Sequence, residues 1–164
     1  MKNFLKYAGA CAALLGLIGF ILLMATPGVH AKITIGITFE GAYDGIKVIF
    51  GNSDDNLKLA WTALVAWILI LVALVILLAG VILPLVKVTA LDKVAGLLNM
   101  VAVGALIVAG ILIFVSAPAL SSANEWASGT KVYLEAGWVV AGILSLLGGL
   151  VAVAPTVVNL LEKK

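Results

Sequence analysis

The sequence has little of what soluble enzymes and nucleic-acid-binding proteins need. Charged residues make up only 11% of its 164 residues, whereas an average soluble domain has about 25%. All ten basic residues are lysines, so there is no guanidinium group for bidentate phosphate recognition, and the scattered lysines form no basic patch for nucleic acid. A single histidine, His30, and a single cysteine, Cys11, are too few for a zinc site or an internal disulfide.

Groups for catalysis are also missing. The sequence contains no Ser/His/Asp set, no paired catalytic acids and no glycine-rich phosphate loop, so we expect no enzyme activity and no cofactor. The cluster Asn52–Asn56 could offer oxygen ligands to calcium, but it lacks the glycine and the terminal glutamate of an EF-hand loop. We expect this cluster to cap a helix that begins before Leu57, and we expect no metal site.

Hydrophobic residues are abundant instead, at 64%, and they gather in four runs. These runs lie at about 8–29, 61–83, 94–117 and 134–158. At 1.5 Å per residue, about 20 helical residues cross a bilayer, so the sequence predicts a membrane all-α four-helix transmembrane bundle that forms a single four-span domain. The first run also resembles a secretory signal cleaved after Ala31. Because its apolar part is longer than the 7–15 residues typical of a signal, we expect an uncleaved span, with cleavage as the alternative.

The lysines predict the orientation. Six of them fall in the short segments on the side that holds both termini, and four fall in the longer outer loops 30–60 and 118–133. Lysine is enriched on the cytoplasmic side, so we expect both termini in the cytoplasm and both outer loops outside the cell. The outer loops have neither a disulfide nor an Asn-x-Ser/Thr site, which favours the plasma membrane of a bacterium or an archaeon.

The first outer loop is the only long polar segment. Apolar residues alternate from Lys32 to Phe39, and a second β-type run covers Ile46–Phe50, so the sequence predicts an antiparallel β-hairpin. A two-stranded hairpin is marginal alone, and its apolar face needs cover. A third strand from Thr130–Tyr133, the outer helix ends or another molecule could provide this cover. The predicted interaction residues are Ile33, Ile35, Ile37, Phe39, Val48 and Phe50.

Small residues in the spans predict how the helices pack, because helices in lipid associate where their backbones approach closely. In the second and third spans small residues recur every seven residues, which predicts a left-handed crossing of these two helices along a seam. In the fourth span they recur every four residues, which predicts a close helix contact, either inside the bundle or in an oligomer. We expect Asn99 to form an interfacial or interhelical hydrogen bond. The predicted packing residues are Ala66, Ala73, Gly80, Ala95, Ala102, Ala109, Gly137, Ala141, Ser145 and Gly149.

The layout of four spans, with both termini inside and a β-hairpin in a long first outer loop, resembles the claudin-like tetraspan architecture. In that family the first loop carries a Gly-Leu-Trp element and two disulfide-bonded cysteines. Neither is present here, and Trp61 is the only tryptophan near the loop. The resemblance therefore implies the layout and not the barrier function of that family, and the chain is closer to small bacterial tetraspan proteins of unassigned role.

These features favour a non-enzymatic integral membrane protein with a structural or interaction role. We expect its partners to be the lipid bilayer and, through the outer hairpin loop, an envelope protein or another copy of the chain. A small channel or transport accessory subunit is one alternative, and a membrane anchor subunit of an envelope complex is another. Charged residues are absent from the middle of every span, which argues against a proton-driven transporter.

Overall fold

The computed structural model describes residues 2–35, 37–54, 56–85, 95–126 and 129–162, and it is mostly helical. Its elements in chain order are α1 (Lys2–Ala25), β1 (Pro27–Ile35), β2 (Ile37–Asp44), α2 (Gly45–Phe50), α3 (Trp61–Leu85), α4 (Ala95–Phe114), α5 (Ser116–Ala123), β3 (Lys131–Leu134) and α6 (Ala136–Glu162).

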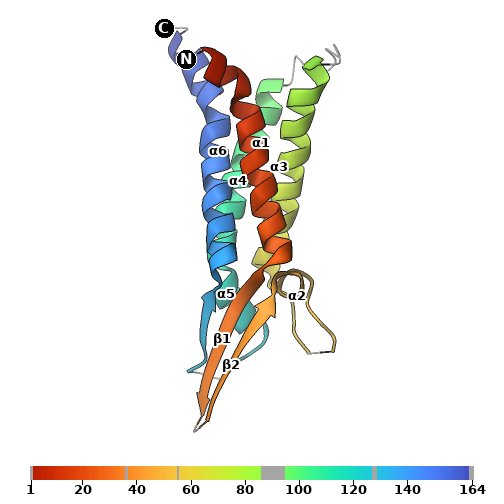
Figure 1. The fold of residues 1–164 in the computed structure, drawn as a ribbon, viewed down its shortest axis with the longest axis vertical. Coiled ribbons are helices and arrows are strands. Elements are labelled where there is room, and N and C mark those ends of the chain that lie inside the picture. Colours follow the sequence, from red (N-terminus) through yellow and green to blue (C-terminus); the bar gives the residue numbers. More distant parts are fainter. Residues whose placement is uncertain (1, 36, 55, 86–94, 127–128, 163–164) are drawn as a thin grey trace.

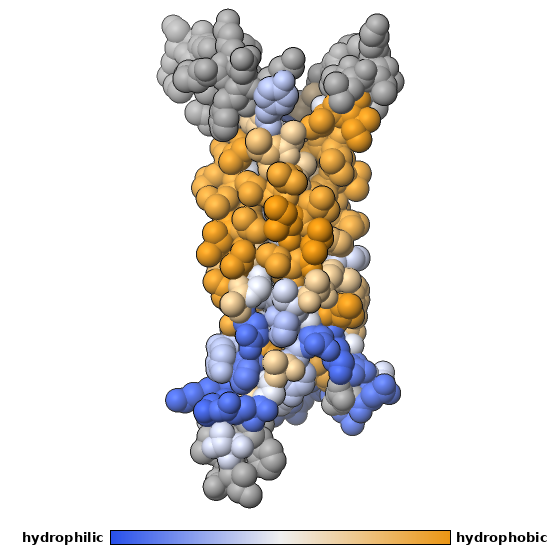
Figure 2. All heavy atoms as spheres, in the orientation of Figure 1, coloured by the Kyte–Doolittle hydropathy of each residue, from blue (hydrophilic) through white to orange (hydrophobic). Residues whose placement is uncertain are grey.

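Four of these helices are long and apolar enough to cross a membrane, which confirms the predicted number of apolar helices. The apolar stretches are Tyr7–Ala25 of α1, Trp61–Ile82 of α3, Ala95–Phe114 of α4 and Ala136–Ala154 of α6. Figure 2 shows the band of hydrophobic side chains around the middle of the molecule and the hydrophilic side chains that gather below it. The structure thus has the side-chain distribution of a membrane-embedded protein.

Two of these helices end earlier than the sequence predicted. α1 stops at Ala25 instead of near residue 29, because Pro27 has no N–H to donate within a helix and begins β1. α4 stops at Phe114, and the short helix α5 takes up the remainder of the predicted third span. Pro118 lies in the first turn of α5, where its missing N–H costs no helical hydrogen bond.

The four long helices form a ring. α1 packs against α3 and α6, and α4 packs against the same two helices. The start of α1 and the end of α6 lie together at one end of the bundle, while the strands and the short helices α2 and α5 lie at the other end (Figure 1). We refer to these as the terminal end and the sheet end.

Most of the predicted packing residues lie inside this ring. Ala66, Ala73, Ala102, Ala109, Ala141 and Ser145 are fully buried. In α6, a Cβ atom on Gly137 would lie 2.2 Å from Oγ1 of Thr26, and a Cβ atom on Gly149 would lie 2.7 Å from Cγ1 of Ile107. The small residues of α6 therefore contact neighbouring segments of the same chain.

Gly80 and Ala95, which were predicted to continue the seams, are exposed near the terminal end. No atom of another described segment lies within 4 Å of the position that a Cβ on Gly80 would take. A straight α-helix drifts by about 20° per heptad, so Gly80, two repeats beyond Ala66, rotates away from the contact. The seam prediction is wrong at Gly80 for that reason, and it also fails at Ala95, in the first turn of α4.

A three-stranded antiparallel sheet with the order β2-β1-β3 stands at the sheet end. The predicted hairpin is present, but its second arm is β2 and not the run Ile46–Phe50, which forms the helix α2. The register pairs Ile33 with Phe39 and Lys32 with Glu40. A five-residue apolar run fits a strand or a helical turn equally well, so the second arm was placed wrongly.

Of the three candidates for cover of the hairpin, the third strand is present. β3 pairs antiparallel with β1, from Val29 opposite Leu134 to Lys32 opposite Lys131. The hairpin is therefore completed, near the bundle, by a strand from the loop between α5 and α6.

Candidate functional site

The candidate site is the assembly at the sheet end, because polar side chains concentrate there. Its sheet has one apolar face and one polar face, as the alternation of side chains along a strand requires. On the apolar face Val29 and Ala31 are buried, and the ring of Tyr43 stacks on that of Trp126, with centroids 5.5 Å apart. The helix α5 contacts β3. This face is therefore covered near the bundle.

The polar face begins with a cluster around His30. Its Nδ1 lies 3.0 Å from Oε1 of Glu135, and its ring stacks on that of Tyr133, with centroids 4.9 Å apart. His30 and Tyr133 are also cross-strand partners. Among the described residues, no group of three or more His, Cys, Asp or Glu side chains could hold a metal ion. The cluster thus connects β1 to the segment between β3 and α6.

Farther out on the same face, Lys32 and Glu40 form an ion pair between β1 and β2. The hydrogen bond between them, and then the charge of Lys32, lower the pKa of Glu40 from its usual value. The same hydrogen bond and the charge of Glu40 raise the pKa of Lys32. Both side chains are exposed, so this pair contributes little to the stability of the fold.

The hairpin extends beyond the third strand. β3 pairs with β1 only as far as Lys32, whereas β1 continues to Ile35, where, among the described residues, it is paired with β2 alone. The outer edge of β2 has no neighbouring strand in the described part of the chain. Strand alternation places positions 33, 35, 37 and 39 on the face that carries Val29. The predicted side chains at those positions, Ile33, Ile35, Ile37 and Phe39, lie outside the described part.

Val48 and Phe50 do not belong to the hairpin, and their assignment to its interaction face was wrong. Val48 is fully buried in α2. Phe50 packs edge-on against the ring of Trp67 on α3, with centroids 5.3 Å apart. The ring of Phe20 on α1 also lies against the ring of Trp67, with centroids 5.7 Å apart. Val48 and Phe50 therefore help to hold α2 across the ends of α1 and α3.

A tight junction joins the bundle to the sheet around Trp138, which is fully buried. Its indole N–H donates to the carbonyl of Leu23 at 3.2 Å. A Cβ atom on Gly28 would lie 2.7 Å from this ring, and a Cβ atom on Gly45 would lie 2.0 Å from the same carbonyl. Real Cβ atoms do not approach so closely, so these positions require glycine. Sequence reasoning missed the junction because its members are far apart in the chain.

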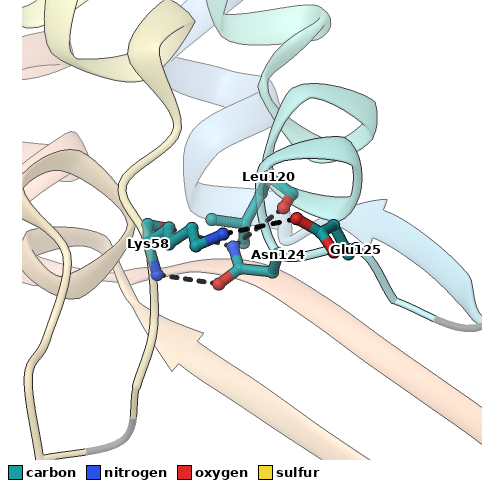
Figure 3. A network of polar contacts seen from close by, with 4 residues as sticks. All are labelled: Lys58, Leu120, Asn124 and Glu125. Carbon is teal, nitrogen blue, oxygen red and sulfur yellow. Dashed lines mark hydrogen bonds and ion pairs between the residues drawn. The ribbon is translucent and has the colours of Figure 1, made fainter.

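Asn124 links the two loops at the sheet end, the one that precedes α3 and the one that follows α5 (Figure 3). Its side-chain amide accepts a hydrogen bond from the N–H of Lys58 at 2.7 Å and donates to the carbonyl of Lys58 at 3.0 Å. It also donates to the carbonyl of Leu120, one turn earlier, at 2.9 Å. The ammonium of Lys58 lies 3.5 Å from Glu125. This amide latch joins the segment before α3 to the end of α5.

The predicted helix cap before Leu57 is wrong. Asn52 and Leu57 form a small β-bridge, with both backbone hydrogen bonds at 2.8 Å, and the N–H of Asp54 donates to Oδ1 of Asn52. The next helix begins only at Trp61. The side chain of an asparagine commonly forms a hydrogen bond with the backbone two residues ahead. Here this local hydrogen bond stabilises a turn and does not cap a helix.

The predicted hydrogen bond of Asn99 between helices is confirmed. Its Nδ2 donates to the carbonyl of Ala152 on α6 at 2.9 Å. A second polar contact lies at the sheet end, where Thr62 donates to Ser116 at 3.1 Å and Ser116 donates to the carbonyl of Leu112. Each of these groups is satisfied within the chain, as helices in lipid require.

No protein-family model matches the chain, and no curated protein matches it in sequence.

Proposed function

We propose that this chain is a non-enzymatic membrane protein that binds another protein, or a second copy of itself, through the hairpin of β1 and β2. In this proposal the sheet end faces the outside of the cell and both termini are cytoplasmic. The observation that carries the proposal is the length of the hairpin, which continues past the end of β3. Near the bundle, β3 adds the third strand that stabilises a hairpin. Beyond the end of β3 the hairpin has only two strands.

Two properties of this outer segment suit it to docking. The free edge of β2 presents unpaired backbone N–H and C=O groups, onto which a strand from a partner can add. The apolar pattern of Ile33, Ile35, Ile37 and Phe39 continues the face that α5 and Trp126 cover closer to the bundle. A partner that covers this continuation buries apolar area, which is the main favourable term in association.

The base of the hairpin is held firmly, and this supports the same proposal. The glycine contacts around Trp138 fix the end of α1 against the start of α2, and the latch at Asn124 fixes the second outer loop. A rigid base reduces the entropy lost when the hairpin binds, so more of the contact energy appears as affinity.

The channel alternative receives less support. Polar side chains in the bundle form two separate contacts, one at Asn99 near the terminal end and one between Thr62 and Ser116 near the sheet end. A continuous path needs polar groups between these levels. Ser145 is buried against Gly19 of α1, in a close helix contact.

The anchor-subunit alternative is a case of the proposed function in which the partner belongs to an envelope complex.

Cysteine cross-linking in native membranes tests the proposal. Cys11 is first replaced by serine, and a new cysteine is placed at Thr38, an exposed residue of β2. Ser53, exposed in the neighbouring turn, gives the matched control. We expect Thr38→Cys to yield a dimer or a defined heavier adduct with a short bismaleimide, and Ser53→Cys to stay monomeric. Equal yields from both variants would contradict docking through the hairpin.

The same Ser53→Cys variant tests the orientation. A membrane-impermeant maleimide should label it in intact cells or spheroplasts without permeabilisation. Labelling only after the membrane is opened would place the sheet end in the cytoplasm.

A further inference from the structure

The directions of the three strands restrict which partner can pair with the free edge of β2. β1 runs away from the helix bundle, and β2 returns toward it (Figure 1). β3 is antiparallel to β1, so it runs in the same direction as β2. β1 lies between the other two strands, so β2 and β3 form the two edges of the described sheet. Both edge strands therefore run toward the bundle.

A second copy in the same membrane can offer this edge only a parallel strand. Copies in one membrane are related by a rotation about the membrane normal, and this rotation does not change whether a strand runs toward or away from the bundle. β2 of one copy would therefore pair in parallel with β2 or β3 of another. Both pairings within the described sheet are antiparallel, and parallel pairing is slightly less stable per residue.

The two parallel arrangements also have steric and polarity problems. A two-fold rotation that brings two β2 strands together turns one sheet over, so the polar face of one copy would continue the apolar face of the other. Pairing of β2 with β3 of a neighbour would set the copies three strand spacings apart, about 14 Å. Two packed helices are together about 20 Å wide, because their axes lie about 8–10 Å apart and each is about 10 Å across. Bundles that stand side by side would therefore overlap.

The charges of β2 indicate the chemistry of the strand that would pair with it. β2 has two acidic residues, Glu40 and Asp44, and no basic one. Both are exposed, and strand alternation puts them on the same face. Lys32 contacts one oxygen of Glu40, and because a carboxylate has about four acceptor positions, Glu40 can bind a second cation as well. A strand with basic residues four positions apart is therefore complementary to β2.

Gly41 lies between these two acidic residues, on the opposite face of β2. Beyond its two chain neighbours, no described atom lies within 4 Å of the position that its Cβ would take. Its cross-strand partner Ala31 is also small. A large apolar side chain opposite Gly41 would fill this space, as aromatic residues do beside glycines at sheet edges.

We propose, on the basis of the docking function above, that the β2 edge binds an extended segment of a different protein. This segment runs antiparallel to β2. It carries basic residues opposite Glu40 and Asp44 and a large apolar residue opposite Gly41.

A seven-residue peptide, acetylated and amidated at its ends, tests this chemistry. In Lys-Val-Thr-Phe-Lys-Val-Thr, antiparallel pairing sets the lysines opposite Asp44 and Glu40 and the phenylalanine opposite Gly41. Fluorescence anisotropy measures its binding to the purified full-length protein in mild detergent. At low salt we expect it to bind about tenfold more tightly than Glu-Val-Thr-Phe-Glu-Val-Thr, in which two attractions become repulsions. Equal binding of the two peptides, or binding of neither, would overturn the proposal.

Asp44→Lys locates the binding site. Asp44 makes no side-chain capping bond to α2, so the change leaves the helix start intact. The preference for the lysine peptide should fall to about twofold or less, because one attraction is then opposed by one repulsion. Asp54→Lys, at an exposed position outside the sheet, is the matched control and should keep the full preference. The same loss in both variants would place the peptide elsewhere and contradict the proposal.

Photo-cross-linking in native membranes separates this proposal from the docking function on which it rests. Two differently tagged copies, both Cys11→Ser and Thr38→Cys, are co-expressed and labelled with a maleimide-benzophenone, which needs no cysteine on the partner. We expect heavier adducts that carry one tag only. An adduct with both tags would support docking through the hairpin but overturn a different protein as the partner. The absence of any adduct would contradict the docking function itself.

Discussion

Glycines at the two ends of the helix bundle have opposite surroundings. At the sheet end, Gly28, Gly45 and Gly137 each lack room for a Cβ atom, since the nearest atoms would be 2.0–2.7 Å away. At the terminal end, Gly80 and Gly96 have no atom of another described segment within 4 Å of that position. The same residue type thus allows close contact at one end and faces open space at the other. The comparison indicates that the junction between bundle and sheet is packed more closely than the terminal end, whereas Gly41 and Gly129, farther out at the sheet end, again have no described atom within 4 Å.

The largest effect is expected at Gly45. Its substitution by alanine would place the new Cβ 2.0 Å from the backbone carbonyl of Leu23, which has no flexible end that can move aside. We expect Gly45→Ala to lower the free energy of unfolding by about 3 kcal/mol or more, or to prevent folding. Thermal unfolding in mild detergent, followed by circular dichroism, measures the change.

Gly80→Ala is the matched control for this substitution. It places a methyl group in open space and removes a glycine from a helix interior, so the helix should gain up to about 1 kcal/mol. A loss of stability at Gly80 comparable to that at Gly45 would contradict the difference between the two ends.

Trp138→Phe gives the next largest effect. The substitution removes the hydrogen bond to the carbonyl of Leu23 and leaves a void under β1. We expect a loss of about 2–3 kcal/mol in unfolding free energy. Trp61, which is 59% exposed at the start of α3, is the control, and Trp61→Phe should change the same free energy by less than about 0.5 kcal/mol. Equal effects would mean that the junction does not depend on the buried indole.

A smaller effect is expected for the latch between the outer loops. Asn124→Asp keeps an acceptor for the N–H of Lys58 but removes the donor for the carbonyls of Lys58 and Leu120. We expect a loss of about 1–3 kcal/mol, measured by unfolding and by faster hydrogen exchange in residues 56–60.

Glu125→Gln removes the ion pair with Lys58 and leaves the amide of Asn124 in place, so it distinguishes their contributions to the stability of the latch. The side chains of Lys58 and Glu125 are 66% and 83% exposed, so the salt bridge contributes little. We expect hydrogen exchange in the same segment to be nearly unchanged. A larger effect from Glu125→Gln than from Asn124→Asp would assign the latch to charge instead of to the amide.

Composition and periodicity were sufficient for the apolar helices, and they gave the third strand as one of three candidates for cover of the hairpin. The four runs are long enough that their helical state does not depend on their neighbours, and Lys131–Leu134 is a β-rich segment that follows a turn. The apolar run Ile46–Phe50 was misassigned because five residues cannot distinguish a period of 2 from one of 3.6.

The junction at Trp138 and the latch at Asn124 could not be predicted for a different reason. The indole of Trp138 meets a carbonyl that is 115 residues earlier in the chain, and Asn124 meets Lys58, which is 66 residues earlier. A hydrogen bond to a backbone group leaves no residue-type signal at the acceptor, because every residue has a carbonyl. Such contacts are defined only once the helices are placed in space.

The smallest expected effect concerns the ion pair of Lys32 and Glu40 on the hairpin, and it depends on pH. The lowered pKa of Glu40 means that the pair stabilises the hairpin above the ordinary carboxyl value of 4.5 and that this contribution is lost as the pH falls through the pKa of the folded state. On the alkaline side, the raised pKa of Lys32 keeps the contribution until the pH rises past 10.5. Hydrogen exchange of β1 and β2, corrected for the intrinsic pH dependence, should therefore be constant from pH 5.5 to 9 and faster below 4.5. In Glu40→Gln the acid-side increase should disappear; an unchanged increase would show that the loosening does not come from the ion pair of Lys32 and Glu40.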